Sequence, residues 1–136
     1  MVLRRITMEE VNNKLDYQSE VVQRWGETKA YNEYTKKTKN YSKDKWNNII
    51  AGMDNIIKEF SLSMIDGKSI DSSEVQKLVA TLQEYITDNY YECTNDILAG
   101  LGKMYVADER FKNNMDKHSE GTAEYTSKAI EVYCRI

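Results

Sequence analysis

Residues 42–67 read SKDKWNNIIAGMDNIIKEFSLSMIDG, and this stretch decides the fold class. Over residues 46–64 the apolar side chains recur three and four residues apart without interruption. This spacing is typical of one buried face of an α-helix. Ser42 precedes the run as a helix N-cap, and Gly67 follows it where a C-terminal glycine belongs. The stretch predicts a helix over about residues 43–65.

Downstream of this helix the sequence predicts two more helices that are separated by a break. Residues 71–74, Asp-Ser-Ser-Glu, form another capping arrangement that opens a helix. The apolar face of this helix consists of Val75, Leu78, Val79, Leu82 and Ile86. We place its end at residues 89–93, because helices beyond about 25 residues are unusual in small domains. Thr94 is then the N-cap of a helix that ends near Val106, with Asp96 favourable in its first turn.

The C-terminal part of the chain is predicted to contain a turn and one last helix. Residues 108–116 are expected to form a short turn, and residues 121–135 a final helix. The buried face of this final helix is expected to comprise Tyr125, Ala129, Ile130 and Tyr133. No stretch of the sequence alternates convincingly as a strand does, so the predicted fold class is all-α.

The N-terminal forty residues carry a weaker helical pattern. Residues 7–10, Thr-Met-Glu-Glu, have the form of a capping box and predict a helix to about residue 23. A second, strongly basic segment follows over residues 27–40. Apolar positions are sparse in both, and burial of an apolar face supplies most helical stability. We therefore divide the single domain into an N-terminal segment, residues 1–40, and a core, residues 41–136.

The composition of the 136 residues excludes several classes of protein. Hydrophobic residues make up 40% and charged residues 30%, and proline is absent. With a mean hydropathy of −0.71, this balance indicates a soluble globular domain. No apolar run approaches the roughly 18 residues of a membrane span, so no membrane association is expected. The net charge of −3 argues against a basic nucleic-acid surface, and we expect no nucleic-acid binding by this chain alone.

Few residues offer the chemistry of a catalytic or metal site. The single histidine, His118, lies among polar neighbours and is interpreted as a solvated linker residue. Cys93 and Cys134 are far apart and form no metal-binding pair, so we expect free thiols in a cytoplasmic protein, with no metal and no cofactor. A nucleophilic Cys–His pair would need one cysteine to approach the histidine, and nothing in the sequence supports this. The chain is therefore not expected to be an enzyme.

The aromatic content is unusual, with 10 tyrosines against 2 phenylalanines and 2 tryptophans. Tyrosine combines an apolar ring with a polar tip and suits cleft walls better than a dry core. Tyr90 and Tyr91, beside Cys93, form the densest such spot. A ligand cleft and a set of half-buried tyrosines at helix ends explain this composition equally well.

Four stretches of the sequence resemble one known family. They are residues 25–31 (WGETKAY), 38–43 (TKNYSK), 91–93 (YEC) and 100–111 (GLGKMYVADERF). They are similar, in the same order and spacing, to the TipAS antibiotic-recognition domain, the effector-binding half of certain MerR-type transcriptional activators. The resemblance implies a globin-like helical fold without haem and a deep cleft for hydrophobic antibiotics such as thiopeptides. It also implies that residues 1–40 form a lid, which is loosely ordered until the ligand arrives.

The resemblance also assigns roles to individual residues. Cys93 matches the cysteine that, in thiopeptide sensors, adds to a dehydroamino acid of the antibiotic. Its predicted place before a helix N-terminus would lower the pKa of its thiol and favour the thiolate. The expected cleft is lined by Tyr90, Tyr91, Ile97, Leu101, Met104, Tyr105 and Phe111. The expected lid residues are Trp25, Tyr31 and Tyr34.

The sequence is accordingly expected to encode the drug-sensing domain of a MerR-type activator, with covalent capture of the drug by Cys93. In full-length activators a DNA-binding winged helix and a dimerising coiled coil precede this domain. Neither is found here, so dimerisation is expected only through the missing coiled coil. Two alternatives remain open. One is a non-covalent multidrug sensor or drug-sequestering protein, and the other is a helical module that binds a partner peptide.

Overall fold

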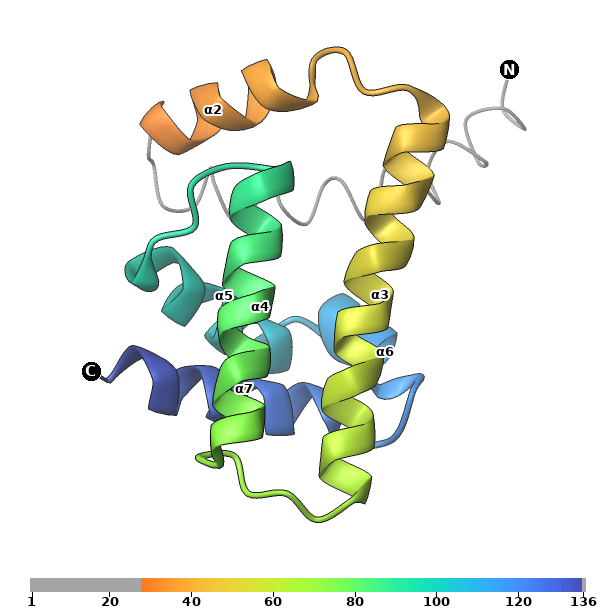
Figure 1. The fold of residues 1–136 in the computed structure, drawn as a ribbon, viewed down its shortest axis with the longest axis vertical. Helices are drawn as coiled ribbons and strands as arrows, with labels where there is room; N and C mark the ends of the chain where they lie inside the picture. The colour runs from red at the N-terminus through yellow and green to blue at the C-terminus, as the bar shows by residue number, and fades with distance from the viewer. Residues whose placement is uncertain (1–27, 136) are drawn as a thin grey trace.

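The structure is a computed structural model that describes residues 28–135. These residues form six α-helices and no strand, which confirms the predicted all-α class (Figure 1). The helices are α2 (Thr28–Thr38), α3 (Lys43–Ile65), α4 (Ser73–Asn89), α5 (Asn95–Ala107), α6 (Glu109–Asp116) and α7 (Thr122–Cys134). The helix predicted to begin near residue 7 lies outside the described residues. None of the six described helices is long and apolar enough to cross a membrane.

Capping side chains begin the helices where the sequence predicts. The hydroxyl oxygens of Ser42, Ser72 and Thr94 each accept a hydrogen bond from the backbone N–H three residues further on, at 3.0, 3.3 and 3.3 Å. Each bond satisfies one of the N–H groups that have no partner within the helix. Gly67 follows α3 with a φ of +77°, a conformation that favours glycine. The predicted bounds of α3, α4 and α5 are confirmed.

The helices pack around one apolar core. Helices α3 and α4 lie side by side and run in opposite directions, and α7 crosses both of them (Figure 1). Helix α5 packs against α7. Helix α2 lies beyond the end of α4 that is remote from the connection between α3 and α4 (Figure 1). The largest fully buried side chain is Tyr91, in the turn after α4, and α3, α4, α5 and α7 supply others, which include Phe60, Val79, Leu82, Leu98, Leu101 and Ile130.

Residues Glu109–Asp116 form helix α6 with Asp108 as its N-cap, so the turn predicted over residues 108–116 is wrong. The carboxylate of Asp108 accepts a hydrogen bond from the N–H of Arg110 at 2.9 Å and thereby caps the helix. Phe111 and Met115, four residues apart, are buried on one face. Two apolar positions in a helix this short are too few for a periodic pattern in the sequence. Burial against the neighbouring helices stabilises it instead.

The last helix buries a different set of side chains from the one predicted. Ala129 and Ile130 are fully buried, as expected, but Tyr125 and Tyr133 are only half-buried. Their hydroxyl groups donate hydrogen bonds to partners outside the core. The remaining buried positions of α7 are Thr122, Ala123 and Thr126. Small side chains on this face let the neighbouring helices approach closely.

The crossing of α3 and α4 depends on the missing side chain of Gly52. A Cβ atom added at this glycine would lie 2.8 Å from Cζ of Tyr85 and in still closer contact with its hydroxyl. The Tyr85 hydroxyl donates a hydrogen bond to the carbonyl oxygen of Ile49 at 2.7 Å. The tyrosine therefore ties α4 to α3 through a space that only glycine leaves open.

The effect of replacing Gly52 on the free energy of unfolding should change sign when the Tyr85 side chain is removed. Gly52→Ala is expected to lower the free energy of unfolding by about 1 kcal/mol or more, because the Tyr85 side chain must leave its place and lose its hydrogen bond. In a Tyr85→Ala background the same change should raise it by up to about 1 kcal/mol, since alanine is the better helix former. Urea unfolding of the four proteins measures both effects. Destabilisation in both backgrounds would contradict this account.

Candidate functional site

An aromatic cluster joins α2 to the ends of α3 and α4. The rings of Tyr34 in α2 and Tyr90 after α4 are stacked, with centroids 6.4 Å apart and planes 10° apart. Trp46 in α3 lies 6.1 Å from Tyr90 and contacts Tyr41 edge-on at 5.1 Å. The Tyr41 hydroxyl also donates to the carbonyl oxygen of Asn89 at 2.8 Å. One predicted lid residue, Tyr34, therefore contacts one predicted cleft residue, Tyr90.

The seven residues predicted to line a cleft all lie in the buried core cluster. They come from the end of α4, the turn after it, α5 and α6, and they are Tyr90, Tyr91, Ile97, Leu101, Met104, Tyr105 and Phe111. Each is buried, with at most 7% of its surface exposed. Burial raises the pKa of the Tyr90, Tyr91 and Tyr105 hydroxyls, so all three are neutral donors at physiological pH. The structure thus brings these side chains together, while their role as a ligand site stays a prediction.

Cys93 lies in the turn between α4 and α5, and both its backbone N–H and its carbonyl oxygen form hydrogen bonds with side chains. Its N–H donates to the hydroxyl of Thr87 at 3.1 Å, and its carbonyl oxygen accepts from the side-chain amide of Gln83 at 2.9 Å. The residue is only 4% exposed. Burial, and to a lesser extent Cys134, raises the pKa of the Cys93 thiol to about 12. The predicted lowering of this pKa is therefore wrong, because desolvation of the thiolate outweighs the helix N-terminus.

Helix α2 contacts the same turn through polar side chains. The carboxylate of Glu33 accepts a hydrogen bond from the N–H of Glu92 at 3.2 Å. The ammonium of Lys29 lies 3.6 Å from the Glu92 carboxylate, and that of Lys37 donates to the carbonyl oxygen of Thr87 at 3.1 Å. These contacts are exposed to solvent, so each contributes little to stability. The basic character of α2 serves in part to hold it against the end of α4.

Sequence analysis did not single out Gln83, Thr87 or Glu33. In the sequence, a glutamine and a threonine on a helix face with few apolar residues are expected to be solvated. Their hydrogen-bond partner, the backbone of Cys93, lies outside α4. The four-residue spacing of Gln83 and Thr87 places them on one side of α4, but this spacing is too common to identify a site.

The structure also bears on the predictions for the single histidine, for metal-ligating side chains and for the remaining lid residues. His118 lies in the connection between α6 and α7, as predicted, but it is half-buried and its Nε2 atom lies 3.0 Å from Oδ1 of Asp54 in α3, so it is not the solvated residue that the sequence predicts. Within residues 28–135 no group of three metal-ligating side chains is present. Trp25 lies outside the described residues, and the structure places Tyr31 in α2 without describing its side chain.

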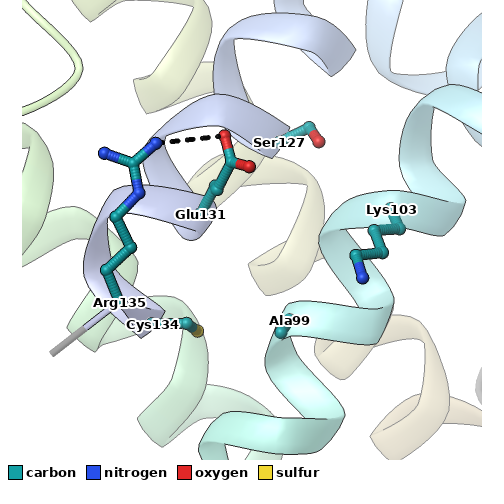
Figure 2. Close-up of a pocket in the computed structure, with 6 residues that line it drawn as sticks. All are labelled: Ala99, Lys103, Ser127, Glu131, Cys134 and Arg135. Atoms are coloured by element: carbon teal, nitrogen blue, oxygen red, sulfur yellow. Dashed lines mark ion pairs between the residues drawn. The ribbon is translucent and has the colours of Figure 1, made fainter.

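A separate hollow of about 320 Å³ lies between α5 and α7 (Figure 2). It is lined by Ala99, Lys103, Ser127, Glu131, Cys134 and Arg135. Glu131 and Arg135 form an ion pair at 3.6 Å on its α7 side. Cys134 is half-buried here, and its thiol donates to the carbonyl oxygen of Asn95 at 3.5 Å. The residues predicted to line the drug cleft do not contribute to this hollow.

Comparison with known proteins identifies relatives over most of the chain. The family described as the TipAS antibiotic-recognition domain matches residues 17–133. The HTH-type transcriptional activator mta of Bacillus subtilis is 36% identical over 118 residues, which are 87% of this chain and 45% of that protein. The HTH-type transcriptional activator TipA of Streptomyces coelicolor is 36% identical over 114 residues, 84% of this chain and 45% of that protein. The chain thus spans less than half the length of these relatives.

A solved structure is similar to this chain in both fold and sequence. It is TipAS from Streptomyces lividans in complex with nosiheptide, described as part of a thiopeptide antibiotic multidrug resistance system. The two structures superimpose with a TM-score of 0.75 at 34% identity, over 88% of this chain and 84% of that one. Together with the family match over residues 17–133, this shows that the chain belongs to the TipAS antibiotic-recognition domain family.

Proposed function

We propose that this chain is the drug-sensing, effector-binding domain of a MerR-type transcriptional activator and that it binds hydrophobic, thiopeptide-like antibiotics. The observation that carries the proposal is the 34% identical TipAS structure, which holds nosiheptide and matches 88% of this chain. Two relatives at 36% identity are transcriptional activators, which favours binding over catalysis as the role of this domain. Such a sensor would act in the cytoplasm.

The proposed cleft is the region of the buried tyrosines at the end of α4. Its opening would require α2 to leave, because Tyr34 stacks on Tyr90. Apart from its aromatic contacts, α2 is attached through exposed polar contacts such as those of Glu33 and Lys37. Residues 1–40 are therefore proposed as the lid and residues 41–136 as the core. A ligand with aromatic or heteroaromatic rings could replace the Tyr34 ring on Tyr90 and recover the stacking energy.

The proposed covalent step is addition of the Cys93 thiol to a dehydroalanine of the antibiotic. The sulfur forms a bond to the β-carbon, the carbon–carbon π bond breaks, and a proton ends on the α-carbon. The step needs the thiolate, which is the nucleophile. Burial raises the pKa of this thiol to about 12, so a docked ligand would have to react from a small thiolate population. The same observation favours a second candidate, a multidrug sensor that binds in this cleft without a covalent bond.

Covalent capture is testable by intact-mass spectrometry with nosiheptide. Incubation should add the whole antibiotic mass to the protein, and peptide mapping should place it on Cys93. Cys93→Ala should abolish the adduct and weaken reversible binding by threefold or less, because the apolar and aromatic contacts precede the bond. Cys134→Ala should behave as the parent. Tight binding without a mass change would support the non-covalent sensor.

The raised pKa of Cys93 predicts an unusual pH profile for the free protein. In a Cys134→Ala background, alkylation of Cys93 by iodoacetamide should accelerate roughly tenfold per pH unit between pH 7 and 9, because the thiolate fraction grows with pH below the pKa. The rate should show no plateau in this range. A plateau that begins within this range would mean that the pKa is not raised, because an ordinary cysteine has a pKa of about 8.5.

Hydrogen exchange should distinguish a lid from a part of the core. In the free protein, amides of α2 should exchange faster than those of α3 and α4, because few buried contacts oppose local opening. Saturating nosiheptide should slow exchange in α2 while α4 changes little. Equal protection of α2 and α3 without ligand would show that α2 belongs to the core.

A further inference from the structure

We propose that Gln83 is the positioning residue for Cys93 and that it couples the turn bearing this cysteine to the last helix. The inference rests on the proposed covalent function. Gln83 lies on α4, ten residues before Cys93, and reaches the turn through its side-chain amide.

Both the nitrogen and the oxygen of the Gln83 side-chain amide have hydrogen-bond partners. Its Nε2 group donates to the carbonyl oxygen of Cys93 at 2.9 Å and to Oδ1 of Asn95 at 2.8 Å. Its Oε1 atom accepts from the hydroxyl of Tyr133 in α7 at 2.9 Å. A carbonyl oxygen can only accept, so the nitrogen of the amide must face Cys93. The orientation of this side chain is thus set by its partners.

Thr87 completes the hold on Cys93 from the same face of α4. Its hydroxyl accepts from the N–H of Cys93 at 3.1 Å, and it follows Gln83 by four residues, or about one helical turn. Both backbone polar groups of Cys93 are therefore bound to side chains on α4. Their positions determine where the Cβ–Sγ bond starts, and hence where the thiol meets a docked ligand.

This hold matters more for the reaction than for binding. A thiol must lie near the attacked carbon at a suitable angle, and a misplacement of 1 Å can lower such a rate about a hundredfold. Tyr34 and Tyr90 contact each other directly, and this contact does not involve Gln83. Loss of the Gln83 bonds should therefore slow the covalent step and leave reversible affinity intact.

The chain offers a matched control in Gln76. It lies seven residues earlier on α4, and its Nε2 group also donates two hydrogen bonds, to the carbonyl oxygens of Ile70 at 2.8 Å and Ala129 at 3.1 Å. Like Gln83, it links α4 to α7, but its partners lie outside the Cys93 turn. Replacing either glutamine by methionine removes its two donated bonds with little change in length. Gln83→Met also removes the acceptor of the Tyr133 hydroxyl, a loss that Tyr133→Phe measures separately.

The test measures two rates for Gln83→Met, Gln76→Met and the parent, all in a Cys134→Ala background. With nosiheptide, Gln83→Met should lower the maximal rate of adduct formation about tenfold and leave the half-saturating concentration within twofold. With iodoacetamide, the same variant should react about tenfold faster at Cys93, because the buried thiol is exposed more often once its turn is released. Gln76→Met should change neither rate by more than twofold.

The opposite signs of the two effects distinguish positioning from general loosening of the fold. Tyr133→Phe keeps both donated bonds of Gln83. It should shift each of the two rates in the same direction as Gln83→Met does, but by threefold or less. Equal effects of Gln76→Met and Gln83→Met, or unchanged rates in Gln83→Met, would overturn the proposal. If nosiheptide forms no adduct with the parent, the proposed covalent function fails, and with it the positioning role. The iodoacetamide rates then still decide whether Gln83 holds the turn.

Discussion

Two residues of the turn between α4 and α5, Tyr91 and Cys93, are buried, so their backbone polar groups need partners within the protein, and the rest of the site depends on how these partners are supplied. The N–H of Tyr91 donates to the carbonyl oxygen of Ile86 at 3.3 Å. The N–H and carbonyl groups of Cys93 are bound by Thr87 and Gln83. All three partners belong to α4, so the helix that ends before the turn also holds it. An unpaired group here would cost about 1–3 kcal/mol, which makes one conformation of the turn strongly preferred.

The two sides of this turn are bound in physically different ways. Toward the core it is held by buried hydrogen bonds and by the apolar side chains of α5. Toward α2 it is held by exposed polar contacts, among them Glu33 with the N–H of Glu92, and by the stacking of Tyr34 on Tyr90. Exposed pairs of this kind contribute at most about 1 kcal/mol each. The described contacts thus hold Cys93 from α4 and hold α2 in part through exposed polar groups, which is the arrangement that the proposed lid requires.

Burial of Cys93 also bears on selectivity. A thiol with a pKa of about 12 reacts slowly with small electrophiles. In the proposed mechanism, a ligand bound among the neighbouring aromatic side chains would compensate through proximity. Cys134 is half-buried beside a hollow whose lining residues include no aromatic side chain. The proposed covalent step would therefore make the reaction of Cys93 depend on recognition of the ligand.

Local sequence determined the helices, because caps and apolar periodicity act within a few residues. Ser42 and Thr94 begin α3 and α5 as predicted, and the break after α4 follows from the capping signal at Thr94 and the limited length of helices in small domains. Helix α6 was missed because its stability comes from the burial of Phe111 against other helices. The seven predicted cleft residues do lie in one core cluster, but the direction of the Cys93 pKa shift was wrong. Only the tertiary structure decides burial and the partners of Gln83, since these depend on contacts between helices that are distant in sequence.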